Sequence, residues 1–302
     1  MGSDAHVVVV GGSTGSPALA HRRLDELEAT WSRFRADSEV SRLNAAAGST
    51  VEVSPETWLL LYRAIEGIEL TGGRFDPTVL RDVEALGYDR SFDQLEHRGP
   101  AGQRPERVPP VHRGVLRGSA AITLLDDRRS ARLAAGTGFD PGGIGKGLAA
   151  DLVVAELLAE GAEGASVNVG GDVRAEGRSP TPDGWVVAVE DPWTRTRELS
   201  RCALRSGAVA TSSRCERTWT RGGVQHHHLV DPGTGRSIDS GLAAVTVVAG
   251  EGWLAEVATK AAFVAGAGHA AELVRSLGVT ALLVADDGTV EAVDMPGPGV
   301  AA

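Results

Sequence analysis

The spacing of hydrophobic and polar residues divides the chain into short strands and amphipathic helices. Apolar runs at 7–10, 166–169, 185–189 and 243–248 predict strands. Leu19, Leu24, Leu27 and Trp31 recur at nearly helical spacing, which predicts a helix over 18–34. Further helices are expected from Pro55, after the cap residue Ser54, and over 252–265.

The second half of the chain adds a glycine-dense turn and two hairpins. The turn at 139–147 leads into a helix that ends near 160, with Leu148, Leu152, Ala155 and Leu158 expected to face inward. Hairpins are expected over 121–134, turned at Asp126-Asp127, and over 281–293, turned at Asp287-Gly288.

Strands and helices interleave without a strict βαβ order, so the expected fold class is α+β, that is, mixed α/β. We expect one domain over 1–296 and a short C-terminal tail at 297–302. Residues 89–120 are rich in Arg, Pro and Gly and are predicted to be mostly loop.

Composition narrows the functional classes. The chain has 302 residues, of which 42% are hydrophobic and 23% charged, and its formal net charge is −10. An acidic balance argues against a general nucleic-acid binder and against a polybasic membrane-surface protein. No apolar run approaches the roughly 20 residues that span a bilayer. Because Cys202 and Cys215 are too few for a disulfide framework and the N-terminal apolar block is too short for a signal peptide, a cytoplasmic enzyme or binding protein is expected.

The glycine clusters do not match the common nucleotide-binding patterns. Ser13 breaks G-x-G-x-x-G at 11–16, and Gly147 follows Lys146 where a P-loop needs Ser or Thr. The second cluster still opens a helix, and its free N–H groups would favour an anion near Lys146. The alternative is a plain tight connection with a solvated lysine.

The three adjacent histidines, His226, His227 and His228, suggest metal binding at first sight. Successive strand residues point to opposite faces, so the three cannot all bind one ion. At most one of them is expected to be a site residue.

Six segments of the chain, in a fixed order, carry a family resemblance. They are 32–34 with 37–44, 73–79, 140–147 with 150–151, 168–172, 209–212 and 228–235. Together they resemble the FAD:protein FMN transferase family, also called ApbE, over residues 1 to about 266. The resemblance implies mixed sheets flanked by helices, with a cleft for FAD between lobes. It also implies transfer of FMN from FAD to a Thr or Ser hydroxyl in the flavinylation motif of a target flavoprotein, with release of AMP.

The resemblance also implies roles for individual residues. The residues expected to bind FAD are Met1, Phe34, Arg74, Phe75, Asp76, Asp140, Lys146 and Leu229, and those expected to take part in catalysis are His228, Lys146, Glu256 and Lys260. A hydroxyl nucleophile needs a base near neutral pH, and we expect that base to be His228. The alternative is a structural histidine on a strand.

The magnesium site of the family is altered in this sequence. In the family, an Asp and a Thr on one helix bind the ion together with a carbonyl of the glycine turn; the matching positions here are Glu256, Lys260 and a carbonyl near Gly143. Thr259 is one residue away, about 100° around a helix. A charged lysine has no lone pair for a metal, so magnesium binding is left open. Alternatively, Glu256 and Lys260 form only an exposed helical ion pair.

Two other functions are compatible with the same motifs. The protein would be a non-catalytic FAD-binding protein that stores or delivers flavin, or an FAD pyrophosphatase that uses water to give FMN and AMP. Neither is distinguished from the transferase by the sequence.

Overall fold

The computed structural model describes residues 3–96, 114–125 and 129–295. The chain forms two compact units. Unit 1 contains Ala29–Gly143 and Arg214–Ser240; unit 2 contains Ser3–Glu28, Ile144–Ser213 and the chain from Gly241 onward. Helix α1 (Ser16–Trp31) begins in unit 2 and ends in unit 1.

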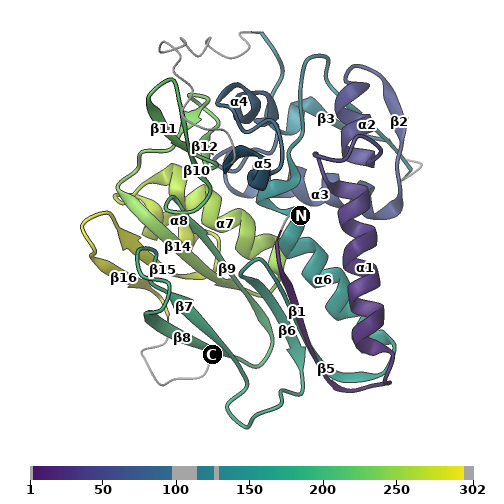
Figure 1. The fold of residues 1–302 in the computed structure, drawn as a ribbon, viewed down its shortest axis with the longest axis vertical. Helices are drawn as coiled ribbons and strands as arrows, with labels where there is room; N and C mark the ends of the chain where they lie inside the picture. Colours follow the sequence, from purple (N-terminus) through teal and green to yellow (C-terminus); the bar gives the residue numbers. More distant parts are fainter. Residues whose placement is uncertain (1–2, 97–113, 126–128, 296–302) are drawn as a thin grey trace. The chain divides into compact units, whose positions relative to one another are not determined.

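Unit 2 is built on a seven-stranded sheet in which every neighbouring pair is antiparallel. In spatial order the strands are β1 (Ala5–Gly11), β5 (Ala162–Val169), β6 (Asp172–Gly177), β9 (Gly207–Ser213), β14 (Leu242–Ala249), β15 (Thr280–Ala285) and β16 (Val290–Val293) (Figure 1). Between β5 and β6, Gly170 and Gly171 both have positive φ, at 60° and 95°, as a two-residue hairpin turn requires.

Helices cover one face of this sheet and a hairpin covers the other. Helix α6 (Gly145–Ala159) packs on β5 and β6, α7 (Gly252–Ala265) on β9 and β14, and α8 (Ala270–Ser276) on β15 (Figure 1). The hairpin of β7 (Trp185–Glu190) and β8 (Glu198–Leu204) buries Trp185 and Leu204 against Val209. The sheet therefore has an apolar core on both sides, which holds α6 and α7 in place.

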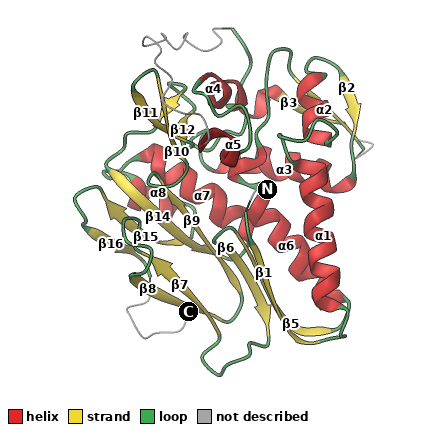
Figure 2. Ribbon diagram, viewed as in Figure 1, coloured by secondary structure: helices red, strands yellow, loops and turns green. Residues whose placement is uncertain are grey.

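Unit 1 combines short helices with small sheets (Figure 2). Its three-stranded sheet has the order β2 (Thr50–Glu52), β4 (Ser130–Leu133), β3 (Ile122–Leu124), and its two hairpins pair β10 (Thr218–Arg221) with β11 (Val224–His227) and β12 (Val230–Asp231) with β13 (Arg236–Ser237). The helices are α2 (Glu39–Ala45), α3 (Pro55–Leu70), α4 (Leu80–Ala85) and α5 (Phe92–Glu96), with 3-10 turns at Gly118–Ala121 and Pro141–Gly143.

The structure confirms the α+β fold class and most of the predicted elements. Helix α7 has the predicted bounds, and α3 begins at Pro55 behind Ser54, whose hydroxyl accepts the N–H of Thr57 at 3.2 Å. The hairpin of β15 and β16 is also confirmed. The helix predicted over 18–34 runs from Ser16 to Trp31, and the strand predicted over 166–169 begins earlier, at Ala162.

The predicted inward face of α6 is wrong in part. Leu148 is buried, but Ala155 is exposed, and Leu152 and Leu158 are only half-buried. Apolar residues occur all around this helix, so periodicity cannot select a face. Its contacts with β5, β6 and α7 bury Val153, Val154 and Leu157 instead.

The loop prediction for 89–120 holds only in part. Phe92–Glu96 forms the short helix α5, and Gly118–Ala121 forms a 3-10 turn. The rest of the segment from 97 to 113 lies outside the described residues, as do the turn at Asp126-Asp127, Met1 and the tail at 297–302. The domain boundaries 1–296 stay a prediction.

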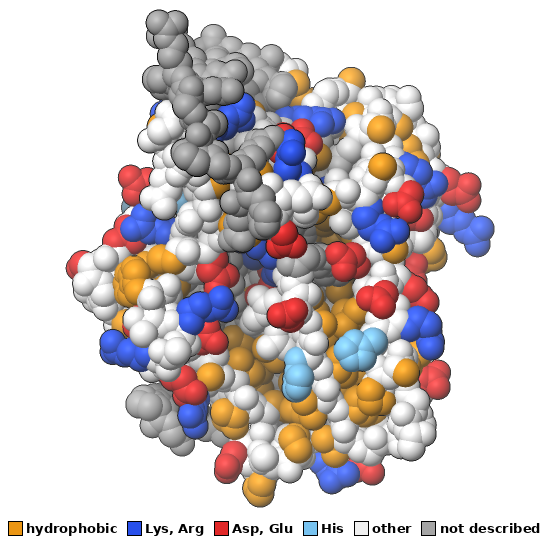
Figure 3. Space-filling view, in the orientation of Figure 1, with side chains coloured by type: hydrophobic (Ala, Val, Ile, Leu, Met, Phe, Trp, Pro, Cys, Tyr) orange, Lys and Arg blue, Asp and Glu red, His pale blue; other side chains and the backbone are white. Residues whose placement is uncertain are grey.

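The surface carries charges of both signs. On the face drawn in Figure 3, Lys and Arg side chains are interspersed with Asp and Glu, and hydrophobic side chains are visible over β1, β6 and β7. Within the described parts of the chain, no helix has the length and apolar character needed to cross a membrane.

Candidate active site

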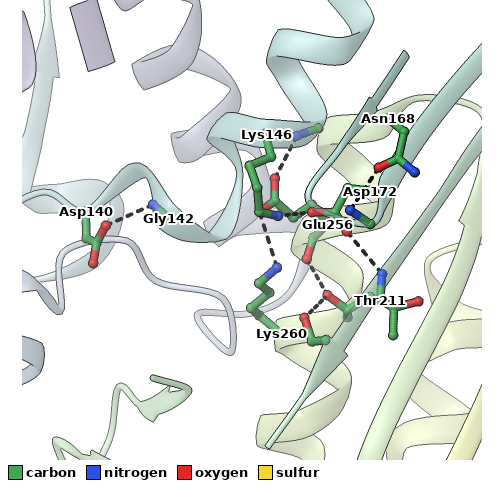
Figure 4. A network of polar contacts seen from close by, with 12 residues as sticks. Asp140, Gly142, Lys146, Asn168, Asp172, Thr211, Glu256 and Lys260 are labelled. Carbon is green, nitrogen blue, oxygen red and sulfur yellow. Dashed lines mark hydrogen bonds and ion pairs between the residues drawn. The ribbon is translucent and has the colours of Figure 1, made fainter. Parts of the chain in front are cut away.

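A cluster of two lysines and two carboxylates lies in unit 2, and we call it the lysine–carboxylate cluster: Lys146, Asp172, Glu256 and Lys260 (Figure 4). Lys146 stands in the first turn of α6, whereas Glu256 and Lys260 are one turn apart on α7. The Nζ of Lys146 lies 2.9 Å from Glu256 Oε1, and the Nζ of Lys260 lies 3.3 Å from the same oxygen. Lys146 also forms an ion pair with Asp172. The fold therefore brings together the three predicted catalytic residues of unit 2, which are Lys146, Glu256 and Lys260.

Backbone groups complete the cluster. Glu256 Oε2 accepts the N–H of Gly147 at 2.8 Å, and Asp172 Oδ1 accepts the N–H of Thr211 at 3.1 Å. Asp172 follows the Gly170-Gly171 turn, where Asn168 Oδ1 accepts the N–H of Gly171 at 2.9 Å (Figure 4). The hairpin turn thus fixes Asp172 at the start of β6, within reach of Lys146.

Glu256 is a buried but ionised carboxylate. Its side chain is 0% exposed, and burial by itself raises the pKa of Glu256. The nearby ammonium groups of Lys146 and Lys260 and the N–H of Gly147 outweigh burial, so that the pKa of Glu256 is held below its ordinary value. A negative charge therefore stays between the two lysines across the physiological pH range.

The hydroxyl of Thr259 points away from this carboxylate. Its Oγ1 donates to the backbone carbonyl of Glu256 at 2.7 Å and lies 2.8 Å from Ser212 Oγ. Thr259 is fully buried in these contacts. The side chain beside the Glu256 carboxylate is therefore Lys260 and not Thr259.

These residues do not fit a magnesium ion. Magnesium prefers oxygen ligands in near-octahedral geometry, but Glu256 Oε1 contacts two ammonium groups and Oε2 already accepts a backbone N–H. A cation beside them would face repulsion from both lysines. Gly143 closes the 3-10 turn before α6. In the described part of the chain, no group of three or more His, Cys, Asp or Glu side chains is arranged to hold a metal.

A second cluster, in unit 1, combines an arginine with aromatic rings; we call it the arginine–aromatic cluster: Arg33, Phe34, Tyr88, Asp140 and Trp219. The Arg33 guanidinium lies 4.2 Å from the ring centre of Phe34 and 4.6 Å from that of Tyr88. Its Nε lies 3.2 Å from Asp140 Oδ2. The rings of Tyr88 and Trp219 are 5.4 Å apart.

This cluster holds one aromatic ring open to solvent. Phe34 is 41% exposed, while Tyr88 is 7% exposed and burial raises its pKa. Asp140 is held by Arg33 and by the N–H of Gly142, which donates to Oδ1 at 2.9 Å (Figure 4). The exposed ring of Phe34 on a rigid support is suited to stacking against a planar ligand. The predicted residues Phe34 and Asp140 are thus joined through Arg33.

The predicted residues at 74–76 face different surroundings. Arg74 is exposed, and its guanidinium donates to the carbonyl of Thr71 at 3.3 Å. Phe75 is buried, and Asp76 Oδ1 accepts both the N–H and the hydroxyl of Thr78, at 2.8 and 2.6 Å. Of the three, Arg74 is the side chain that a ligand can reach directly.

The three histidines differ in their surroundings. His226 stacks on Trp219, and His227 Nε2 lies 2.9 Å from the carbonyl of Ile238; burial lowers the pKa of both. His228 follows the end of β11, is half-buried, and precedes the buried Leu229. The first two are thus held by contacts with Trp219 and with the carbonyl of Ile238, and the expectation of at most one site histidine stays a prediction.

Comparison with known proteins identifies the family. The model of the ApbE family matches residues 1–283. The chain belongs to the ApbE family. Among ApbE relatives, the FAD:protein FMN transferase of Treponema pallidum is 31% identical over 284 residues, which are 89% of this chain and 76% of the relative. That of Rhodobacter capsulatus is 34% identical over 265 residues, which are 84% of this chain but 48% of the relative, so the chain spans about half its length.

Solved ApbE structures share the fold. The ApbE protein of Thermotoga maritima has a TM-score of 0.84 and 30% identity, over 97% of this chain and 94% of that one. The flavin transferase ApbE of Vibrio cholerae has a TM-score of 0.79 over 97% and 94% of the two chains; at 24% identity it supports the fold alone. The expected family, and with it the transferase class, are confirmed.

The structure adds residues that had no predicted role. Arg33, Asp172 and Thr211 lie within the family segments of the sequence, yet only the folded chain shows what each of them contacts. Tyr88 and Trp219 lie in segments without a motif. The Gly-Gly pair before Asp172 is a hairpin signal that predicts where β6 begins.

Proposed function

We propose that this ApbE protein is an FAD:protein FMN transferase that moves FMN from FAD to a Thr or Ser hydroxyl of a target flavoprotein and releases AMP. Family membership and the names of the curated relatives support flavin transfer. The observation that carries the proposal is the lysine–carboxylate cluster, in which two ammonium groups are fixed around a buried carboxylate.

The reaction is a phosphoryl-type transfer. The acceptor oxygen forms a bond to the phosphorus on the FMN side of the FAD diphosphate. The bond from that phosphorus to the bridging oxygen breaks, and AMP leaves with this oxygen. Negative charge spreads over the phosphate oxygens in the transition state, where fixed positive charge is most effective.

The lysines supply this charge in preorganised form. Two ammonium groups and two carboxylates balance in charge, so both lysines can lie largely buried, with side chains 14% and 16% exposed. A buried charge that is already oriented needs no rearrangement during the reaction. We propose that Lys260 supplies in covalent form the positive charge that magnesium supplies in other members of the family.

The other roles belong to unit 1 and follow the family pattern. His228 takes the proton of the acceptor hydroxyl, and Leu229 lies beside it in the chain. Phe34 stacks on a ring of FAD, Arg74 contacts its phosphates, and Asp140 holds ribose. Phe75 and Asp76 support this loop from within, because both are buried. Met1 binds FAD, as the family pattern implies.

One departure from the family pattern is the reason to test the two alternative functions, flavin delivery and FAD hydrolysis. Lys260 departs from the family pattern, and a protein without the metal ligands can retain FAD binding without transfer. Incubation with FAD and a flavoprotein carrying a Thr or Ser flavinylation motif separates the possibilities. AMP with protein-bound flavin supports the transferase, AMP with free FMN supports a pyrophosphatase, and unchanged FAD in the bound state supports a delivery protein.

A further inference from the structure

The first turns of α6 and α7 cross in direct backbone contact at two glycines. A Cβ at Gly252 would lie 2.6 Å from the carbonyl oxygen of Gly147, and a Cβ at Gly147 would collide with the carbonyl of Gly252. Both glycines have ordinary helical φ, so space rather than backbone conformation requires them. Any larger side chain at either position would push the two helices apart.

Each helix carries a carboxylate four residues after its glycine, and each carboxylate binds the other helix. Asp151 follows Gly147 on α6: its Oδ1 accepts the N–H of Gly252 at 2.7 Å and its Oδ2 that of Trp253 at 3.0 Å. Glu256 follows Gly252 on α7 and accepts the N–H of Gly147 at 2.8 Å. The pair is thus reciprocal about the glycine crossing.

The reciprocal bonds replace ordinary helix caps. The cap positions are Ile144 for α6 and Glu251 for α7, and neither side chain accepts a backbone N–H of its own helix. The first N–H groups of a helix need acceptors, and here the partner helix provides them. Whatever fixes one helix start therefore fixes the other.

We propose that Asp151 is a positioning residue, which locks α7 against α6 and so sets where Glu256 and Lys260 lie relative to Lys146. The effect of Asp151 on catalysis rests on the proposed function. Asp151 accepts the N–H groups of Gly252 and Trp253 and in this way holds the helix turn that precedes Glu256. Movement of this turn changes the distance between the two ammonium groups.

Charged neighbours affect the pKa of Asp151. The contact between α6 and α7 that Asp151 makes through the N–H groups of Gly252 and Trp253 is called the lock below. Arg174 on β6 lies with its Nε 3.2 Å from Asp151 Oδ1 and is itself paired with Glu176. Glu251, just before α7, accepts the indole N–H of Trp253 at 2.9 Å. Burial raises the pKa of Asp151 to about 6, helped by Glu251 and opposed by the two N–H groups and Arg174. Below that pH the protonated group no longer offers two charged acceptors, and the lock weakens.

The test compares wild type with Asp151→Asn. The matched control is Asp191→Asn: Asp191 is also buried, its Oδ1 accepts two backbone N–H groups at 2.8 and 3.1 Å, and Arg197 lies beside it, but it sits between β7 and β8. NMR follows the Trp253 indole N–H, assigned with Trp253→Phe, from pH 5 to pH 8. Flavin transfer is measured over the same range.

The lock predicts that the Trp253 indole signal titrates near pH 6 in wild type and in Asp191→Asn but not in Asp151→Asn. It predicts that Asp151→Asn lowers kcat about 10- to 100-fold at pH 8 with little change in KM for FAD. The ratio of the wild-type and variant kcat values should fall toward one below pH 6, whatever other groups titrate in both proteins.

Other results separate the lock from the proposed function. An unchanged kcat in Asp151→Asn, or a Trp253 titration that persists in it, overturns the positioning role. If wild type transfers no flavin while the indole titration depends on Asp151, the proposed function fails and the lock between the helices stands. If Asp151→Asn does not fold, a wild-type indole signal that is flat across pH 6 still overturns the proposal.

Discussion

The two clusters handle charge in opposite ways. In unit 2, the lysine–carboxylate cluster balances two ammonium groups with two buried carboxylates, and the lysine side chains are only 14% and 16% exposed. In unit 1, the arginine–aromatic cluster places one guanidinium between rings and leaves Phe34 41% exposed. Fixed charge must be buried and paired to remain oriented, whereas a stacking ring must stay accessible to its ligand.

This difference predicts which property each cluster controls. Changes in the buried cluster should alter folding stability and the rate of transfer, because a buried charge left unpaired is costly. Changes at the exposed ring should alter FAD binding and little else. The proposed base His228 belongs to unit 1. If it takes the proton of the acceptor hydroxyl, its replacement should lower the rate of transfer and leave FAD binding unchanged.

Replacement of His228 should give the largest effect. His228→Asn keeps the approximate size and removes the basic nitrogen, so transfer should slow by about 10²–10⁴-fold while FAD affinity stays unchanged. The matched control is His227→Asn, which loses the contact with Ile238 and should slow transfer less than about 10-fold. Near wild-type transfer in His228→Asn would reject His228 as the base.

Removal of the central carboxylate should have the next largest effect. Glu256→Ala leaves Lys146 and Lys260 without their shared partner, and the free energy of unfolding should fall by about 3–5 kcal/mol in denaturant titrations. Glu198→Ala is the control: Glu198 pairs with Arg201 at 2.6 Å on the surface, and its loss should leave the free energy of unfolding almost unchanged. An equal decrease in the free energy of unfolding in the two variants would show that burial of the cluster contributes nothing to stability.

The pH dependence of stability should report Asp151. Its pKa is raised to about 6 in the folded state, above the ordinary value of 3.8, so the folded protein binds more protons between these values. This contribution to stability is present below about pH 4 and is lost as pH rises through 6, by up to about 3 kcal/mol. Asp151→Asn lacks it, so the stability of wild type relative to this variant should fall over that range. A difference that is constant with pH would contradict the raised pKa.

The exposed ring should give the smallest effect. Phe34→Ala should weaken FAD binding about 10-fold, the loss of one aromatic contact, and leave the stability nearly unchanged. The control is Tyr62→Ala, which removes an equally exposed ring stacked on Trp58 of α3. Fluorescence titration with FAD measures both; equal weakening by the two substitutions would remove the special role of Phe34.

Local signals in the sequence predicted those elements that depend on local chemistry. Pro55 behind Ser54 determines the start of α3, and the apolar spacing of 252–265 determines α7. The face of α6 was not predictable in this way, because its apolar residues surround the helix and only the sheet and α7 select a side.

The candidate site was predictable where the family pattern points to individual positions, and less so where packing brings residues together. Lys146, Glu256 and Lys260 were chosen from the sequence, and the structure brings them together. Asp172 and Asp151 lie in the family segments, but their partners are more than 20 residues away in the chain, and no local pattern specifies such contacts. The same holds for Tyr88, whose ring packs against those of Phe34 and Trp219.

The most direct test of the account is FMN transfer by the wild-type protein in EDTA, with FAD and an acceptor flavoprotein. Because the positive charge of Lys260 is covalent, activity should persist without metal. Lys260→Thr should lose transfer activity in EDTA, because less positive charge would then compensate the carboxylate of Glu256 near the phosphates. Magnesium should restore part of this activity, and more of it when Lys260→Thr is combined with Glu256→Asp. Wild-type activity that requires magnesium, with the ion bound at Glu256, would contradict the account.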